Sequence, residues 1–385
     1  MEIPLRPLTV LAGQNSAGKS SVLQPLLLMK QTVEAPFDPG PLLLDGPCIR
    51  VQNASTLLWS GPLPSASFTF ALGAQSWTFE RDAHGVRLES LVWAGARLAR
   101  GLPSEVVLQR LLAARLQFPQ GTAIDLLPDR WWFRAEVHGL PAGVTSTTQF
   151  GFSPVPGFLV HLPGLRGNPA RRYPSSPALP MYPGPFHPYV ASVLALWREG
   201  GVHLDAVGED LRRLGLTSEV EPRRSSDSEI ELLVGRTASS RDLVNIADVG
   251  IGVSQVLPVV VALRVAGPHQ LVHIEQPELH LHPNAQVHLA DLLVDAAVRG
   301  VNLIVETHSA LVLRGIQLAV AEGRINPVDV SLNWFTRDSV GATHVRTAEL
   351  DGQGSYGDWP VDFADIEMSL DERYIGASIP KVSTR

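Results

Sequence analysis

The stretch LTVLAGQNSAGKSS, residues 8–21, decides the fold of this 385-residue chain. It begins with an apolar run, Leu8–Leu11, that is typical of a strand, and continues into the glycine-bounded loop Gly13–Ser20, a G-x-x-x-x-G-K-S pattern. The apolar run Val22–Met29 follows and predicts a helix, which Pro25 should shorten or kink. A strand, a glycine-rich loop and a helix in this order predict an anion-binding turn at a helix N-terminus.

The residues of this loop fit a phosphate-binding role one by one. Glycines let the backbone curl so that successive N–H groups point at phosphate oxygens. Lys19 would place a cation on the β- and γ-phosphates, and the Ser20 hydroxyl would ligate Mg²⁺. A fortuitous glycine-rich turn is the alternative. We predict a nucleotide site with the residues Gly13, Asn15, Ser16, Ala17, Gly18, Lys19, Ser20 and Ser21.

Composition narrows the class of protein. Hydrophobic residues make up 45% and charged residues 18%, which excludes wholesale disorder and fibrous architectures. Apolar runs such as Val256–Leu263 fall short of the roughly 18 residues that cross a bilayer, and no export signal is evident. The single cysteine, Cys48, excludes an internal disulfide. We therefore expect a cytoplasmic protein with no membrane segment.

The net charge of −7 argues against wrapping nucleic acid as the main task, although a local basic groove would still allow nucleic acid to bind. In the last third of the chain, strands alternate with helices, which predicts a parallel sheet. The expected strands are Gln270–Ile274 and Val301–Glu306, and the expected helices are Val249–Val265, Ala285–Val298 and Ala310–Glu322.

The middle of the chain has a different pattern. Short alternating segments over Gly46–Val137 predict small antiparallel strands, and the Pro- and Gly-rich stretch Gly151–Pro188 predicts an irregular connector. Helices are expected at Tyr189–Glu199 and Leu204–Leu214, and no heptad run supports a coiled coil. We expect an α/β fold, with a mostly parallel sheet flanked by helices, a small antiparallel β subdomain and a helical insertion.

The expected division of the chain follows these patterns. It comprises the first part of the core at residues 1–45, the β subdomain at 46–150, the connector and helical insertion at 151–240, the second part of the core at 241–348, and a C-terminal appendage at 349–385.

A second apolar strand ends in the string EQPELHLHP at residues 275–283. Beside the phosphate loop, Glu275 and Glu278 would lie where Mg²⁺ and an attacking water need an acidic partner. Two alternatives are a metal site built from Glu278, His280 and His282, and a solvated acidic turn. The flanking prolines argue against the metal site, because they interrupt the strand that would align its ligands.

Two further segments place polar groups near the same edge. The strand Val301–Val305 ends in Glu306–Ser309, where His308 could donate a hydrogen bond to a γ-phosphate or play a structural role. The segment Asp248–Gln255 opens an apolar helix with two glycines and a serine, either as a plain cap or as a second anion-binding helix start. Parallel strands bind ligands at their carboxyl edge, so we expect these groups to converge.

Taken in order, these segments resemble the ABC-class ATPases, and more narrowly the prokaryotic AAA-type ATP-binding proteins related to the overcoming-lysogenization-defect ATPases. The resemblance is carried by Gly13–Ser21, Asp248–Pro258, Ile274–Pro283 and Glu306–Ser309, with weaker matches at Leu162–Tyr173 and Trp359-Pro360. It implies a P-loop NTPase fold of the ABC type. Such relatives begin with one more strand, whereas seven residues precede Leu8, so we expect a truncated start or a different sheet edge.

The resemblance also implies an ATP sandwich, in which ATP and Mg²⁺ lie between two subunits of a homodimer or higher oligomer. Lys19 and Ser20 of one subunit would bind ATP. The signature segment of the second subunit would close over the γ-phosphate, with Gly250, Gly252, Ser254 and Gln255. Glu275 then falls, with Ser20, at the position that supports Mg²⁺, and His308 falls at the switch histidine.

The candidate catalytic residues are Glu275, Gln276, Glu278 and His308 of a Mg²⁺-dependent ATPase. Gln276 falls where transporter-type ABC ATPases keep the general-base glutamate. A glutamine amide orients water but cannot take its proton. Either turnover is slow, or Glu278 or Glu306 serves as the base.

In that family the ATPase is often the sensor half of an anti-phage defence system. The 77 residues after His308 (385 minus 308) contain neither a Cys/His zinc framework nor an acidic Asp-x-Asp cluster, so we expect any effector to be a separate chain. The preferred hypothesis is an ATP-hydrolysing switch that controls such an effector. Its alternatives are a DNA-maintenance ATPase, a transporter's ATPase subunit and a nucleotide sensor that scarcely hydrolyses.

The insertion between Ala35 and Arg241 is expected to recognise the partner. Within it, the adjacent Trp131 and Trp132 predict buried core rather than an exposed anchor. Three arginines, Arg166, Arg171 and Arg172, suggest a weak anion site.

Overall fold

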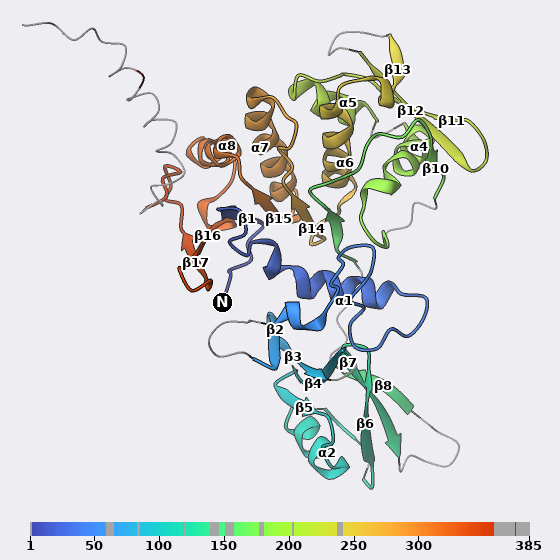
Figure 1. The fold of residues 1–385 in the computed structure, drawn as a ribbon, viewed down its shortest axis with the longest axis vertical. Helices are drawn as coiled ribbons and strands as arrows, with labels where there is room; N and C mark the ends of the chain where they lie inside the picture. Colours follow the sequence, from blue (N-terminus) through green and yellow to red (C-terminus); the bar gives the residue numbers. More distant parts are fainter. Residues whose placement is uncertain are drawn as a thin grey trace, which may run out of the picture.

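The computed structural model of the chain describes residues 2–58, 65–82, 85–114, 116–118, 120–138, 146–150, 158–176, 181–201, 204–236, 242–357 and residue 374. An α/β body carries the phosphate loop, and a β-rich body lies beside it, with helix α1 (Gln24–Glu34) between the two (Figure 1). Most of the expected C-terminal appendage, including Trp359-Pro360, lies outside the described residues.

The α/β body is built on a six-stranded sheet in the order β17-β16-β1-β15-β14-β9. Its strands are β17 (Thr343–Ala348), β16 (Val330–Arg337), β1 (Leu8–Gly13), β15 (Asn302–Thr307), β14 (Leu271–Glu275) and β9 (Val160–Leu162). All neighbours are parallel except β17 against β16. Every residue of β1 is buried, as expected for a strand covered on both faces. The predicted mostly parallel sheet is confirmed.

The helices of this body agree with the sequence patterns. They are α4 (Val190–Gly200), α5 (Leu204–Arg213), α6 (Ile251–Val265), α7 (Pro283–Val298) and α8 (Ala310–Ala321). Helices α7 and α8 pack closely at Gly315 of α8. A side chain at this position would place its Cβ only 2.5 Å from the Cβ of Ala290 on α7. Pro25 lies in the first turn of α1, after a 3₁₀ turn at Ser20–Val22, so it shortens this helix as predicted.

The irregular connector predicted over 151–188 is wrong at two places, because Tyr173–Pro174 forms the short strand β10 and Val160–Leu162 forms β9, a fully buried strand of the main sheet. A three-residue strand among prolines and glycines carries no periodic signal of its own. Strand β16 is also missing from the sequence prediction. It contains the buried polar residues Ser331 and Asn333, which interrupt the apolar run that would have predicted a buried strand. The Asn333 side chain forms hydrogen bonds with Ser331 and Thr347.

The β-rich body confirms the expected antiparallel strands. One sheet contains β2 (Ser67–Leu72), β3 (Gln75–Asp82), β4 (Gly85–Trp93) and β5 (Ala96–Ala99), and another contains β6 (Ala123–Asp129), β7 (Trp132–His138) and β8 (Ser146–Phe150). Helix α2 (Ser104–Ala113), which was not predicted, packs on β5 and β6. Trp131 and Trp132 are 0% and 5% exposed, so the prediction that they belong to the core is confirmed.

A third small sheet lies next to α4 and α5, and all of its strands except β13 fall within the stretch expected to be a helical insertion. It contains β10 (Tyr173–Pro174), β11 (Val220–Arg224), β12 (Glu229–Gly235) and β13 (Leu243–Asn245). Further 3₁₀ turns occur at Ala54–Leu57, His187–Tyr189, Ile246–Asp248 and Pro327–Asp329. Among the described residues, no helix has the length and apolar character needed to span a membrane.

Helix α1 belongs to both bodies. Leu26 and Leu27 lie in a core cluster with residues of β1, β15 and β16, whereas Leu28 and Met29 lie in the core cluster of the β-rich body. The helix that follows the phosphate loop is therefore packed on the main sheet by one face and on the β-rich body by another.

Candidate nucleotide site

The phosphate loop leaves β1 with a curled backbone. Gly13, Ser16 and Gly18 have positive φ angles of 136°, 60° and 98°. A Cβ on Gly13 would lie 2.2 Å from the Phe335 carbonyl oxygen on β16, so only glycine fits where the loop leaves the sheet. Such a curl before a helix N-terminus is the arrangement that gathers backbone N–H groups around a phosphate.

Lys19 lies inside this loop and is 6% exposed. Its Nζ donates to the carbonyl oxygens of Gly13 at 3.0 Å and Gln14 at 2.8 Å. Burial lowers the pKa of Lys19, and the Glu306 and Glu278 carboxylates oppose that shift. Charged phosphate oxygens form stronger hydrogen bonds than backbone carbonyls, so the ammonium group is placed to exchange these contacts for phosphate.

Ser20 meets the carboxylate at the end of β15. Its Oγ donates to Glu306 Oε2 at 2.7 Å, and His273 Nε2 lies 3.0 Å from Glu306 Oε1. An ionised carboxylate only accepts, so His273 donates from Nε2. A hydroxyl and a carboxylate are oxygen donors of the kind that Mg²⁺ takes, so the donor set of Ser20 and Glu306 fits this ion.

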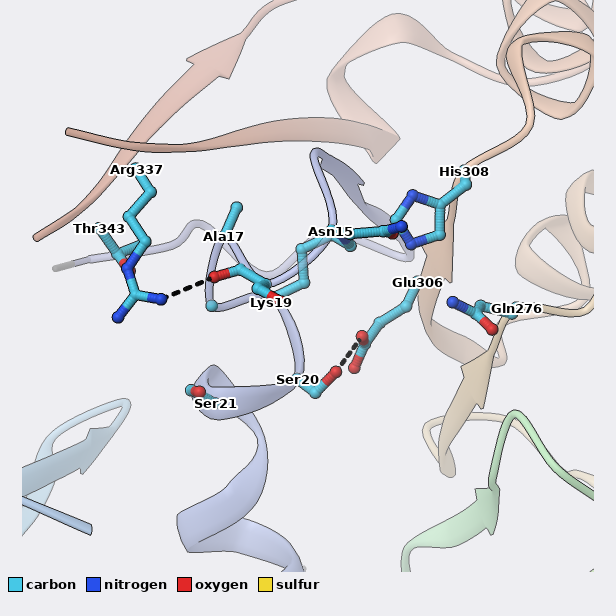
Figure 2. Close-up of a pocket in the computed structure, with 12 residues that line it drawn as sticks. Asn15, Ala17, Lys19, Ser20, Ser21, Gln276, Glu306, His308, Arg337 and Thr343 are labelled. Atoms are coloured by element: carbon cyan, nitrogen blue, oxygen red, sulfur yellow. Dashed lines mark hydrogen bonds between the residues drawn. The ribbon is translucent and has the colours of Figure 1, made fainter. Parts of the chain in front are cut away.

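These groups surround one pocket of about 450 Å³ (Figure 2). The pocket is lined by Asn15, Ser16, Ala17, Gly18, Lys19, Ser20, Ser21, Gln276, Glu306, His308, Arg337 and Thr343. Its volume falls in the roughly 300–1,000 Å³ range of small-molecule sites. The structure thus brings the predicted loop residues Asn15–Ser21 together with Gln276, Glu306 and His308 and adds Arg337 and Thr343, whereas the predicted Gly13 does not line the pocket.

His308 and Gln276 enter the pocket from the ends of β15 and β14. The His308 side chain is half-buried, and burial and the Lys19 charge lower its pKa. Gln276 adopts φ 44°, an uncommon value for a residue with a side chain, and its N–H donates to the Glu306 carbonyl at 2.7 Å. A backbone contact therefore fixes the turn that carries the Gln276 amide.

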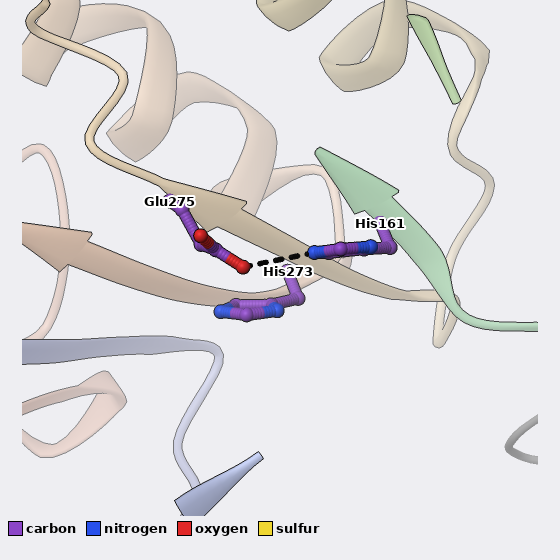
Figure 3. Close-up of side chains that lie close together, drawn as sticks. All are labelled: His161, His273 and Glu275. Carbon is purple, nitrogen blue, oxygen red and sulfur yellow. Dashed lines mark hydrogen bonds and ion pairs between the residues drawn. The ribbon is translucent and has the colours of Figure 1, made fainter. Parts of the chain in front are cut away.

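Glu275 has different neighbours from those the sequence suggests. Its Oε1 lies 3.0 Å from His161 Nε2 (Figure 3). Its Oε2 accepts from the Gly164 N–H at 3.2 Å. Burial alone would raise the pKa of Glu275, but the His161 hydrogen bond and the Gly164 N–H lower it overall. Glu275 does not line the nucleotide pocket, and Glu306, not Glu275, contacts Ser20.

The cluster of His161, His273 and Glu275 brings metal-ligand atoms within 4.8 Å of one another. The two imidazoles are 1% exposed and stacked, with ring centroids 5.2 Å apart and planes 13° from parallel. Nearly parallel rings direct their lone pairs along parallel lines rather than at a common point, and each ring already meets a carboxylate. We interpret the cluster as two neighbouring histidine–carboxylate pairs.

The alternative metal site of Glu278, His280 and His282 is wrong. Glu278 is 8% exposed and its Oε1 accepts from the His308 N–H at 2.7 Å, whereas His280 and His282 are exposed. These residues occupy a turn rather than a strand, so their side chains do not converge. Burial raises the pKa of Glu278, whose Oε2 is buried without a hydrogen-bond partner.

The signature segment lies away from the nucleotide pocket of its own subunit. Gly250 precedes α6, and Gly252 lies in its first turn next to the His280 carbonyl oxygen. Ser254 Oγ donates to the Ile251 carbonyl at 2.8 Å, and Gln255 Nε2 donates to the Gly167 carbonyl at 2.7 Å. Both predicted polar side chains are therefore engaged within the subunit.

Arg166 connects that helix to the strand end. It is 5% exposed, and its guanidinium donates to the carbonyl oxygens of Gln255, Glu275 and Gln276 at 3.2, 2.7 and 3.5 Å. The proposed three-arginine anion site is wrong, because Arg171 pairs with Asp248 and Arg172 with Glu229 and Glu231.

A phosphate loop at the centre of a mostly parallel sheet, with carboxylate, amide and histidine groups at the neighbouring strand ends, is the arrangement of the P-loop NTPase fold of the ABC type. The predicted fold class is thereby confirmed. Residues 193–314 match the family model described as an AAA domain, putative AbiEii toxin, Type IV TA system. A search of curated protein sequences finds no match.

Solved structures of Smc head domains are similar in fold. One, the SmcHead bound to the C-winged helix domain of ScpA, has a TM-score of 0.52 and 13% identity, over 90% of this chain and 92% of that one. An Smc head with an extended coiled coil bound to the C-terminal domain of ScpA, from Pyrococcus furiosus, has a TM-score of 0.45 and 10% identity, over 97% and 94%. The SMC head domain from Thermotoga maritima has a TM-score of 0.38 and 10% identity, over 91% and 93%.

Proposed function

We propose that the chain is an ATP-hydrolysing switch that binds Mg²⁺-ATP, dimerises around it and controls a separate effector protein. One observation carries the proposal: Lys19, the Ser20–Glu306 pair, Gln276 and His308 surround a single pocket beside the phosphate loop. Lys19 and the loop N–H groups would hold the phosphates, and Ser20 with Glu306 would hold Mg²⁺, which supplies charge stabilisation when bound.

In this proposal Glu306 takes the magnesium-supporting position that the family resemblance assigns to Glu275. Gln276 would orient the attacking water without accepting its proton. Glu278 is the nearest further carboxylate along the turn, burial raises its pKa, which suits a proton acceptor, and its Oε1 accepts from the backbone N–H of His308. The proposal therefore includes slow turnover with Glu278 as the assisting residue.

The position of the signature segment supports the proposed dimer. It does not line the pocket of its own subunit, and Ile251, at the start of α6, is 41% exposed. A second subunit could present this helix start to the γ-phosphate. Control of an effector is supported by the toxin-system description of the matching family model, and the β-rich body, residues 46–150, is the proposed surface for that partner.

ATP turnover by the wild-type protein and by Lys19→Ala, measured over a range of protein concentrations, tests the proposal. We expect Lys19-dependent turnover whose specific activity rises with concentration, because each complete site needs two subunits. If the wild type binds ATP but is no faster than Lys19→Ala, the protein is a nucleotide sensor rather than an ATPase. If it does not bind ATP, the proposal is wrong.

A DNA-maintenance ATPase is the second candidate, because the fold is similar to that of an Smc head. The two functions differ in DNA binding. Fluorescence anisotropy with a labelled duplex at several salt concentrations separates them: affinity that falls steeply with salt favours the DNA function. Absence of such binding, with ATP-dependent capture of a protein partner encoded beside this chain, favours the effector switch.

A further inference from the structure

The hairpin formed by β16 and β17 touches the phosphate loop on the side away from Glu306. Its turn joins Arg337, at the end of β16, to Thr343, at the start of β17, and both residues line the nucleotide pocket. Figure 2 shows these two side chains on one side of the loop and Gln276, Glu306 and His308 on the other. The pocket therefore has two ends, with the phosphate loop between them.

The hairpin is fixed to the loop at two points. Arg337 Nε donates to the Gly341 carbonyl within the hairpin at 2.8 Å, and its Nη1 donates to the Ser16 carbonyl of the loop at 3.3 Å. Thr343 packs against the loop as well, because a Cβ on Gly18 would lie 2.7 Å from its Oγ1. These contacts hold the guanidinium group of Arg337 at the edge of the pocket.

The way in which Arg337 is held leaves its flat faces uncovered by these two contacts. The N–H bonds of a guanidinium group point outward in its plane, so hydrogen bonds to backbone carbonyls fix the plane without covering either face. The Arg337 side chain is exposed at the pocket. Among the described residues, no Phe, Tyr or Trp lines the pocket, so the guanidinium is the planar group at this end.

The opposite end of the pocket sets the direction in which a nucleotide would lie. Mg²⁺ held by Ser20 and Glu306 would bridge the β- and γ-phosphates, which places these phosphates on the Glu306 side of the loop. The nucleoside would then lie at the other end, beside Arg337. Arg guanidinium planes stack on nucleic-acid bases, and their charge is attracted to the electron-rich face of a ring.

We propose that Arg337 stacks on the base of the bound nucleotide and makes the site prefer purine nucleotides. The two fused rings of a purine cover more of the guanidinium plane than the single ring of a pyrimidine, so they remove more surface from water. The inference rests on the proposed ATPase function, because the direction of the nucleotide follows from the proposed Mg²⁺ position.

Isothermal titration of the full chain with ADP, CDP and pyrophosphate, each with Mg²⁺, tests this role. Pyrophosphate carries the phosphates without a base, and none of the three requires the hydrolysis of a γ-phosphate. We expect Arg337→Gln to weaken ADP binding about fivefold and to leave pyrophosphate within about twofold, as for loss of an exposed cation–π contact. The wild type should bind CDP about threefold more weakly than ADP, and Arg337→Gln should narrow that difference.

A second variant and a matched control separate stacking from charge. Arg337→Lys keeps the positive charge but not the plane, so it should weaken ADP binding about threefold. Arg346 is an exposed arginine on β17 that does not line the pocket, and Arg346→Gln should bind all three ligands like the wild type. Thermal unfolding verifies that each variant is folded.

The inference alone is overturned if Arg337→Gln weakens ADP and pyrophosphate equally, because Arg337 would then act by holding the loop at Ser16. It is also overturned if the wild type binds CDP as tightly as ADP, if Arg337→Gln or Arg337→Lys binds ADP like the wild type, or if Arg346→Gln loses as much ADP affinity. If the wild type binds neither ADP nor pyrophosphate, the proposed function is wrong as well.

Discussion

Two carboxylates at neighbouring strand ends have opposite surroundings. Glu275 and Glu306 are paired in register across β14 and β15, and each contacts one buried histidine. Glu306 also accepts from Ser20 of the phosphate loop, whereas Glu275 accepts from the Gly164 N–H after β9. The chemistry of the two side chains is the same, so strand order, and not residue type, decides which one contacts the phosphate loop.

The largest effect should come from neutralising one carboxylate and then the other. Glu306→Gln removes the anionic partner of Ser20, and we expect Mg²⁺-dependent ATP turnover to fall about 10²–10³-fold. Glu275→Gln should change turnover less than about threefold. Measuring turnover against Mg²⁺ concentration checks both variants, with circular dichroism to verify folding. A larger loss in Glu275→Gln would return the magnesium role to Glu275.

Gln276→Glu sharpens the comparison by adding a third carboxylate at the pocket. A glutamate can accept the proton of the attacking water, so we expect single-turnover hydrolysis to rise about 10–100-fold. Gln276→Asn, which keeps an amide on a shorter side chain, is the control. Unchanged hydrolysis in Gln276→Glu would show that another residue, with Glu278 the first to examine, already provides the base.

Substitution of the two histidines should affect the apparent Mg²⁺ affinity unequally, in the same order as substitution of the carboxylates they contact. His273→Asn leaves Glu306 Oε1 without its buried donor, and we expect the apparent Mg²⁺ affinity to fall about 10–100-fold, as for other partners of metal ligands. His161→Asn should leave it within about twofold of the wild type. Titration of Mg²⁺ against ATP turnover compares the variants. Equal losses would mean that the four side chains act as one unit.

The smallest effect is on stability against pH. Burial lowers the pKa of His161, so below its unfolded value of about 6.5 the unfolded chain binds a proton that the folded chain does not. The free energy of unfolding should therefore fall as the pH drops from about 7.5 to 5.5, and less steeply in His161→Asn. Urea unfolding at several pH values measures this, with the exposed His138→Asn as control. Identical slopes in all three proteins would contradict the assignment.

Sequence predicts the local chemistry of the nucleotide site but not its neighbours. The loop Gly13–Ser20 is a contiguous motif, so all of its residues could be identified. Glu306 meets Ser20 because β1 pairs with β15 and not with β14, and that order depends on long-range contacts that no local pattern records. The sequence motif therefore indicates Glu275 as the residue that would support Mg²⁺, whereas the order of the strands places Glu306 beside the phosphate loop.

The same reasoning explains the missed strand β9 and the missed role of Arg166. Three residues between glycines and prolines form a strand only because His273 and its neighbours on β14 offer an edge. Arg166 follows directly in that loop, and in an arginine-rich chain it has no distinguishing signal until its carbonyl partners are known.

Because α1 packs on both bodies, it limits how this chain can be truncated or divided into domains. Removing residues 46–150 would expose Leu28 and Met29, which lie in the core of the β-rich body, on the helix that holds the phosphate loop. Lys30, fully buried on the same helix, also contacts the Tyr182 carbonyl of the α/β body. The β-rich body is therefore not a detachable module, and a shortened chain without it needs a redesigned α1 surface.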